Sequence, residues 1–312
     1  MPTINETPLT RAATQMSTEI IPVLRNSLVG RRFMSINPYM KGDGLTNLEV
    51  TKISDLSDAF VQYSLPDGSE HSDSLVASAE IVKVPVLFKN FSVKMQDILT
   101  WENRTVSPGA TNSLDSLTSL TASLKVAEQE EELLFNGWKP DGTTYAIKGM
   151  NQIAGNSVTG GSIATAGTMY GYIGEAIGKL MADKVKGEGD SYNLAITSTI
   201  YTKLITRIMT NGTPEIEYIK KLLGNGSIYV TDTLALQGGS SKEAAIVTPV
   251  DTSRVHFELL NPVDYKIVLA NPEFEGLSPV KGVSYELISP YFKRLNSSSL
   301  CDAVCKITSL EV

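Results

Sequence analysis

Cysteine and histidine are scarce in this sequence of 312 residues, which contains two of each. Cys301 and Cys305 are too few for a disulfide framework, and this scarcity favours a reducing compartment. On a helix such a pair, four residues apart, could approach bonding distance, whereas on a strand the two residues would lie roughly 13 Å apart. We expect two buried thiols, although the sequence leaves open a bond within or between chains.

The two histidines offer little for catalysis or metal binding. His71 stands in a polar turn and His256 in a late strand-like segment, and neither has the spacing of a triad or a metal cluster. In the run EQEEELL, Glu128 shares a helix face with Glu131 or Glu132, but the E-x-x-H pair of carboxylate metal sites is missing. We expect no metal and interpret the run as an acidic face, turned to solvent or to another subunit.

Long apolar runs are also missing, since none approaches the ~18–20 residues of a membrane span. The first residues, MPTINETPLTRAATQ, lack a basic region followed by an apolar one, so we expect no secretion signal. The net charge of −7 argues against a general nucleic-acid binder without excluding a local basic face. These features predict a soluble, cytoplasmic protein with no membrane partner.

The glycine-containing segment GTMYGYIGEAIG carries no phosphate-binding pattern, because it has neither G-x-x-x-x-G-K-S nor a G-x-G-x-x-G that opens from a strand. Its small residues at 167, 171, 174 and 178 predict a helix face that another backbone can approach closely. Trp101 and Trp138, each beside a turn, are interpreted as packing residues rather than ligand stackers. We therefore expect no cofactor and no enzyme activity.

The chain does contain a clear order of helices and strands. Residues 9–29 have apolar positions at spacings of three and four, which predicts a helix that Pro22 interrupts and Gly30 ends. The stretch 46–89 alternates with period two around the polar turn PDGSEHSDS, which predicts an extended hairpin. Because an isolated hairpin is only marginally stable in water, this one must lie against something else.

Residues 112–136 form the clearest predicted element, a helix on the order of 37 Å long that Gly137 ends. Helices at 168–183, 199–209 and 214–223 alternate with short strands and a polar loop, KVKGEGDS, and residues 244–312 are β-rich. This succession predicts a mixed α+β fold with interleaved subdomains. The predicted core stripe of the long helix contains Leu114, Leu117, Leu120, Leu124, Ala127, Glu131 and Leu134.

Several short sequence strings occur in an order along the chain that is typical of a known family. The first is L-x-G-R-[RK]-F, which is matched at residues 28–33 by Leu28, Gly30, Arg31, Arg32 and Phe33. The strand string FSVKMQDIL comes before the long helix, E-x-x-[LI]-[FI]-x-G is matched at its end, and YNLAIT and SIYVTD follow. In this succession, over residues 9–312, the chain resembles the encapsulins, the shell proteins of bacterial and archaeal nanocompartments.

The resemblance implies the major-capsid fold of tailed phages, the Hong Kong 97 type. This fold has an N-terminal helix, an extended β-hairpin loop, a peripheral domain with a long spine helix, and an axial domain. The extended loop would lie over a neighbouring subunit. The implied division assigns 1–45 to the N-terminal helical segment, 46–84 to the extended loop, 85–137 and 246–312 to the peripheral domain, and 138–245 to the axial domain.

The resemblance also implies two kinds of site. Cargo proteins of the family dock a short C-terminal peptide beside the N-terminal helix, which assigns cargo binding to Leu28, Arg31 and Phe33. Arg32 would then hold a carboxylate of a neighbouring strand, and the alternative is that both arginines cap the carbonyl end of the first helix. The loop KVKGEGDS would surround a five-fold pore, whose charge would be set by Lys184, Lys186, Glu188 and Asp190.

The implied function is that of a structural shell protein, which self-assembles as 60 copies or a multiple into an icosahedral nanocompartment around a cargo protein. The alternative on the same fold is a viral or proviral major capsid protein that packages DNA, and nucleic acid is a partner only in that case. The net negative charge of the chain favours a protein cargo over DNA. A third hypothesis, an enzyme of unrelated fold, predicts a small oligomer. The family's flavin-binding tryptophan falls near Gln96, so we predict no flavin.

Overall fold

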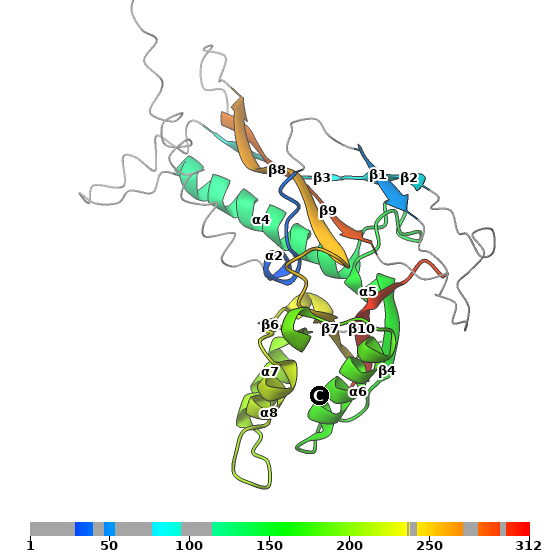
Figure 1. Ribbon diagram of the computed structural model, residues 1–312. Helices are drawn as coiled ribbons and strands as arrows, with labels where there is room; N and C mark the ends of the chain where they lie inside the picture. The colour runs from blue at the N-terminus through cyan, green and yellow to red at the C-terminus, as the bar shows by residue number, and fades with distance from the viewer. Residues whose placement is uncertain are drawn as a thin grey trace, which may run out of the picture.

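The computed structural model describes residues 29–39, 47–53, 77–94, 114–235, 237, 242–270, 280–293 and 298–312. The expected helix up to residue 28, the turn of the hairpin with His71, and Trp101 lie outside these described residues. Within them the chain forms a long helix on a small sheet and, beside it, a larger sheet with its own helices (Figure 1). The predicted α+β class is confirmed.

The long predicted helix is confirmed as α4 (Leu114–Asn136), and Gly137 follows it with a φ of +72°, a conformation that suits glycine. α4 lies along an antiparallel sheet with the strand order β3-β9-β8, and together they form the helix-and-sheet layer (Figure 1). Val126 and Ala127 of α4 pack against Tyr265 of the sheet. The strands are β3 (Val86–Val93), β8 (Phe257–Ala270) and β9 (Val280–Phe292).

The buried face of α4 differs from the predicted stripe. Leu124, predicted to face the core, is 43% exposed, whereas Ser123 and Glu130 are buried. The Ser123 hydroxyl is satisfied there, because it donates to the carbonyl oxygen of Ser119 at 2.7 Å and also bonds the hydroxyl of Tyr265. A helix that buries hydrogen-bonded polar side chains is misread by a pattern that counts only apolar ones.

The larger sheet has five strands in the order β4-β10-β7-β5-β6. β10 runs parallel to β4 and antiparallel to β7, while α6 packs on these three strands and α8 packs on β5. The strands are β4 (Ala154–Thr159), β5 (Tyr192–Ile196), β6 (Ile228–Val230), β7 (Glu243–Pro249) and β10 (Cys301–Leu310). The helices are α6 (Thr168–Ala182), α7 (Ser198–Thr206) and α8 (Glu215–Leu223).

Four shorter helical elements complete these two parts in the described chain. They are α2 (Gly30–Phe33), α5 (Met150–Ile153) and the 3-10 turns η1 (Glu188–Asp190) and η2 (Asp232–Leu234). The two described arms of the predicted hairpin pair antiparallel as β1 (Asn47–Ile53) and β2 (Ala77–Lys83). None of the helices in the described parts of the chain is long and apolar enough to cross a lipid bilayer.

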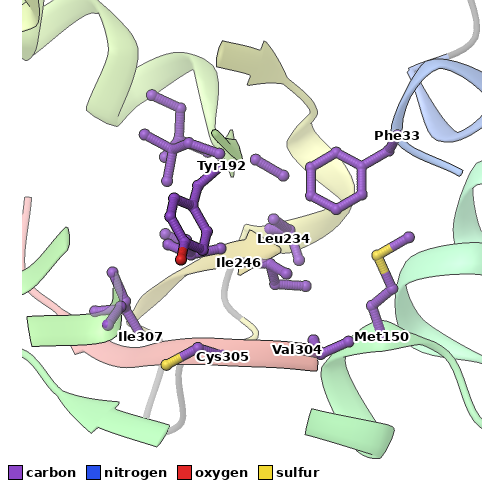
Figure 2. Close-up of a cluster of buried hydrophobic side chains, with 14 of the residues drawn as sticks. Phe33, Met150, Tyr192, Leu234, Ile246, Val304, Cys305 and Ile307 are labelled. Atoms are coloured by element: carbon purple, nitrogen blue, oxygen red, sulfur yellow. The ribbon is translucent and has the colours of Figure 1, made fainter. Parts of the chain in front are cut away.

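One continuous core joins the larger sheet to the first described helix. Figure 2 shows the side chains of Tyr192, Ile246 and Ile307 in this core, with Phe33 of α2 and Met150 of α5 at its edge. Each of the five is at most 3% exposed. The segment around Phe33 is therefore held by the same core that stabilises the larger sheet.

Both cysteines lie in β10, where they are buried and free. The prediction of two buried thiols is confirmed, because an extended strand separates residues four apart too widely for a disulfide. Burial in this apolar setting raises the pKa of the Cys305 thiol to about 12. This thiol stays protonated at neutral pH and is a packing group rather than a nucleophile.

The last strand leaves the helix-and-sheet layer and returns to the larger sheet. β10 pairs with β4 and β7, although the expected division placed residues 246–312 with residues 85–137. Most of β10 is buried and α6 packs on it, which explains why the strand belongs there. We propose that a division by sheets assigns residues 301–310 to the same unit as 138–245.

The small-residue face of α6 meets no close neighbour among the described residues. A Cβ atom added at Gly171 or Gly178 would have no atom within 4 Å, and one added at Gly174 would meet only Leu222, at 3.9 Å. The face is open in the described part of a single chain, so the prediction that another backbone can approach it closely stays a prediction.

Candidate functional site

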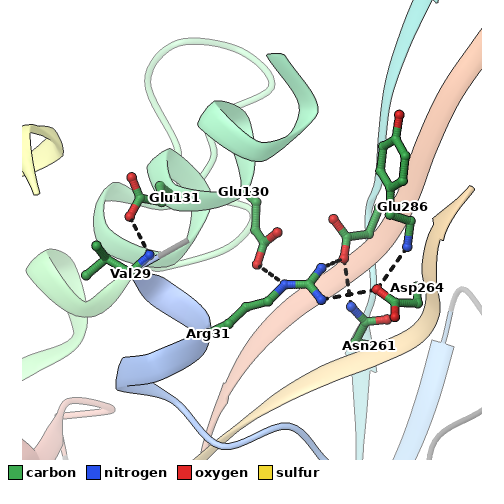
Figure 3. Close-up of polar contacts among 8 residues, drawn as sticks. Val29, Arg31, Glu130, Glu131, Asn261, Asp264 and Glu286 are labelled. Atoms are coloured by element: carbon green, nitrogen blue, oxygen red, sulfur yellow. Dashed lines mark hydrogen bonds and ion pairs between the residues drawn. The ribbon is translucent and has the colours of Figure 1, made fainter. Parts of the chain in front are cut away.

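A buried set of charges surrounds Arg31, at the point where α2 reaches between α4 and the sheet (Figure 3). The guanidinium donates from Nε to Glu130 Oε1 at 2.9 Å, from Nη1 to Asp264 Oδ1 at 3.1 Å, and from Nη2 to Glu286 Oε1. Asn261 adds a bond from Nδ2 to the same oxygen of Glu286 at 2.7 Å. These five residues, the Arg31 cluster, come from α2, α4, β8 and β9.

The Arg31 cluster holds two buried carboxyl groups for one buried guanidinium. The side chains of Arg31, Glu130 and Glu286 are 6%, 1% and 2% exposed, whereas Asp264 is 37% exposed and reaches water. Burial raises the pKa of Glu286 to about 8, the charge of Glu130 adds to this rise, and the guanidinium opposes it. Burial likewise raises the pKa of Glu130, against the opposing effect of Arg31.

Further contacts fix the backbone on both sides of Arg31. The amide of Val29 donates to Glu131 Oε1 at 3.0 Å, which closes the start of α2 onto α4. The ring of Phe33 lies edge-on to that of Tyr229, with the two centroids 5.5 Å apart. The Tyr229 hydroxyl donates to the carbonyl oxygen of Arg32 at 3.1 Å. Residues 29–33 are therefore anchored to the helix-and-sheet layer and to the larger sheet.

The structure places the expected cargo-binding residues unequally. Leu28 lies outside the described residues, while Arg31 and Phe33 are buried. Arg31 holds carboxylates of α4 and the sheet, while the side chain of Arg32 is exposed and its expected role stays a prediction. The assignment of cargo binding to these residues stays a prediction.

Sequence reasoning missed the partners of Arg31. The run EQEEELL was interpreted as an acidic face, and this is wrong for Glu130, which is buried, although Glu128 is exposed. One signal was present: Glu130 follows Val126 by four residues and precedes Leu133 by three, so it lies on an apolar helical stripe. Asn261 and Glu286 carry no comparable signal in the sequence.

The second predicted site, the charged loop of residues 184–190, is exposed at all four expected pore positions. The buried residues Val185 and Gly187 alternate with them and hold the loop against the protein. The loop lies at the end of the larger sheet where β5 begins, because the amide of Glu188 donates to the carbonyl oxygen of Val250 at 2.9 Å. The four exposed residues are Lys184, Lys186, Glu188 and Asp190.

Two contacts set the charge pattern of this loop. Lys186 Nζ lies 3.8 Å from Asp190 Oδ1, so these two charges partly offset one another. Glu188 Oε1 accepts hydrogen bonds from the backbone and the hydroxyl of Ser253. The hydroxyls of Ser253 and Thr252 lower the pKa of Glu188, so this carboxylate is ionised at neutral pH.

No group of three or more histidine, cysteine, aspartate and glutamate residues in the described chain is placed to hold a metal ion. His256 is buried, and its backbone amide donates to Asp251 Oδ2 at 2.8 Å. The described residues thus present an architectural charge cluster and an exposed charged loop.

Replacing Arg31 by alanine would leave Glu130 and Glu286 buried without a cation. We expect Arg31→Ala to lower the free energy of unfolding by about 3–5 kcal/mol, the usual cost of breaking a buried ion pair. Urea denaturation at pH 7 measures this change. Arg32→Ala is the matched control, and its exposed side chain should cost less than about 1 kcal/mol. Equal losses in the two variants would contradict the role given to Arg31.

Comparisons with known proteins agree with this architecture. The family Linocin_M18, described as encapsulating protein for peroxidase, matches residues 5–247. Among solved structures, the capsid of the Myoviridae phage XM1 is similar with a TM-score of 0.67 and 14% identity, over 89% of this chain and 90% of that one. No curated protein matches the chain significantly.

A virus-like particle protein from Pyrococcus furiosus is similar with a TM-score of 0.58 and 13% identity, over 96% of this chain and all of that one (100%). The Mycobacterium phage Ogopogo chain gives a TM-score of 0.58 and 16% identity, over 90% and 91% of the two chains. These likenesses show the Hong Kong 97 capsid fold, and the family match covers most of the sequence. The chain belongs to the encapsulin family and is a structural shell protein of that fold.

Proposed function

We propose that 60 copies of this chain, or a multiple of 60, close into an icosahedral shell around a peroxidase or another cargo protein. The observation that carries this proposal is the match of residues 5–247 to a family described by its encapsulated peroxidase. A reducing, cytoplasmic setting for the shell is part of this proposal, and the scarcity of cysteine in the sequence supports it.

The surface near the hairpin supports assembly. A groove of about 770 Å³ lies between the base of the hairpin, β3 and the segment after α4, and its lining includes Lys83, Phe88 and Trp138. Phe88 is 61% exposed and Trp138 45% exposed, so both rings present apolar surface at the groove. Apolar side chains gathered at a groove are typical of surfaces that another protein covers.

We propose that residues 54–76 of a second copy cover this groove. That segment contains the apolar string AFVQYSL, five acidic residues, and neither lysine nor arginine. Its composition suits an apolar groove that has Lys83 in its lining. Assembly would then supply the partner surface that an isolated hairpin lacks.

A viral or proviral capsid that packages DNA is the second candidate, favoured by the similarity to the phage XM1 capsid. Both candidates need the same shell and differ in what lies inside it. The net charge of −7 favours the protein cargo, because packaged DNA calls for a compensating positive inner surface.

Microscopy of the protein expressed alone tests the shell and separates the two candidates. We expect uniform hollow spheres by negative stain, with an absorbance ratio at 260 and 280 nm typical of protein free of nucleic acid. Spheres rich in nucleic acid would support the viral alternative. Monomers or dimers as the only species would count against assembly.

The cargo site is proposed at the segment that begins with Leu28. The side chains of Arg31 and Phe33 face the protein interior and would hold the backbone of this segment in place. We expect Leu28→Glu to abolish co-purification of a co-expressed peroxidase cargo while hollow particles still form. Arg31→Ala should instead reduce the yield of particles themselves. Normal cargo loading in Leu28→Glu would exclude Leu28 from the site.

The exposed loop of residues 184–190 is proposed to line an opening of the shell. We expect Lys184→Glu and Lys186→Glu together to slow the entry of iodide into particles several-fold, because reversed charge repels the anion. Stopped-flow quenching of an encapsulated fluorophore measures the rate. Lys125→Glu, at an exposed position of α4, is the control. Unchanged iodide entry in the loop variant would place the opening elsewhere.

A further inference from the structure

The Arg31 cluster brings two buried carboxyl groups to one guanidinium. Glu130 accepts a hydrogen bond from Arg31 Nε and Glu286 accepts one from Arg31 Nη2, and both side chains are almost fully buried. Two carboxylates that share one buried cation would leave a net negative charge out of water, so the pair holds one proton. With that proton, one guanidinium balances one buried carboxylate, and Asp264 is left to interact partly with water.

The donors around the pair show where this proton lies. Both Arg31 Nη2 and Asn261 Nδ2 donate to Glu286 Oε1, and Arg31 Nε donates to Glu130 Oε1. Glu130 Oε2 is buried and accepts no hydrogen bond from any described N–H or hydroxyl group. Glu130 Oε2 is therefore an oxygen of the pair at which the shared proton meets no competing donor.

We infer that this shared proton operates a latch: while it is bound, α2 is clasped to α4 and β9, and its loss loosens α2 from them. Loss of the proton leaves two buried carboxylates facing a single guanidinium in surroundings that water does not reach. Because Arg31 is the only member of the Arg31 cluster that α2 contributes, repulsion between Glu130 and Glu286 is relieved when α2 moves and water enters.

Other charged groups on the packed elements do not replace this proton. On α4, Glu131 is turned to the amide of Val29, and on β8 the partly exposed Asp264 bonds Arg31. Of the other described groups on these elements, Lys266 and Lys89 are exposed, and burial raises the pKa of Tyr265, so that it is neutral at pH 7. The buried Glu258 of β8 is paired with Lys293 at 3.0 Å.

The direction of the pH dependence follows from the raised pKa of Glu286, about 8 in place of the usual 4.5. The clasped state binds a proton that the loosened state releases between these two values. Clasping is therefore strongest at and below pH 4.5, weakens as the pH rises toward about 8, and changes little above it. One proton shifts the opening equilibrium about tenfold per pH unit within this window. The consequence for the shell, an inference that rests on the proposed assembly, is that the shell loosens at alkaline pH.

Hydrogen exchange of the backbone amides of residues 29–37 tests the latch in the full-length protein, in whatever assembly it forms. After correction for intrinsic exchange, we expect opening in the wild type to increase about tenfold per pH unit from pH 6 to about 8, and then to level off. Glu286→Gln has no proton to lose at this position and should be flat over the same range. Glu175→Gln, at an exposed position of α6, is the control and should follow the wild type.

A second measurement keeps the inference falsifiable if Glu286→Gln does not fold. Infrared difference spectra between pH 6 and 9.5 should contain the carbonyl stretch of a buried protonated carboxyl group, and Glu130→Gln should lose this signal. A wild-type slope in Glu286→Gln, or the absence of a protonated carboxyl band in the wild type, would overturn the latch. Light scattering on the same samples reports assembly separately, so a failure to form shells would not be mistaken for a failure of the latch.

Discussion

The guanidinium of Arg31 limits how the rest of the chain can pack. Its partners lie 99, 233 and 255 residues further along the sequence, in α4, β8 and β9. A buried ion pair of this kind adds little net stability compared with an apolar substitute, but a misplaced partner is strongly destabilising. The cluster therefore acts mainly on the specificity of folding. Only the arrangement of α2, α4 and the sheet that brings Arg31 to its carboxylates has a low energy. The string G-R-R-F is then a structural motif first, because Gly30, Arg31 and Phe33 all face inward.

The same constraint explains the path of the chain between the two sheets. Phe33 enters the core of the larger sheet while Arg31, two residues earlier, enters the helix-and-sheet layer. β10 then returns from the end of the sequence to lie between β4 and β7, where its cysteines fill the core. The core of the larger sheet is complete only when the first described segment has packed against it and the last has joined the sheet as β10. Such long-range pairing favours slow, cooperative folding.

Local patterns predicted local structure well. The bounds of α4, the hairpin arms, the turn at Gly137 and the buried thiols of β10 follow from periodicity, glycine conformation and strand spacing. The errors share a physical cause. Leu124 was assigned to the core because the pattern ignored Ser123 and Glu130, whose burial depends on partners in a distant sheet. The partners of Arg31 were likewise missed, because no local rule identifies which distant carboxylates an arginine meets.

The order of strings along the chain predicted the fold and the family, while the site residues remain predictions. This difference has a physical reason. A capsid fold is shared by chains of very different sequence because it depends on core volume and strand order, both of which tolerate substitution. What a shell encloses depends instead on the side chains that its inner surface presents, and these are free to change without disturbing the core. In our proposal Arg31 serves the fold and Leu28 serves cargo binding. Selection is therefore expected to act on these two residues of one short motif for different reasons.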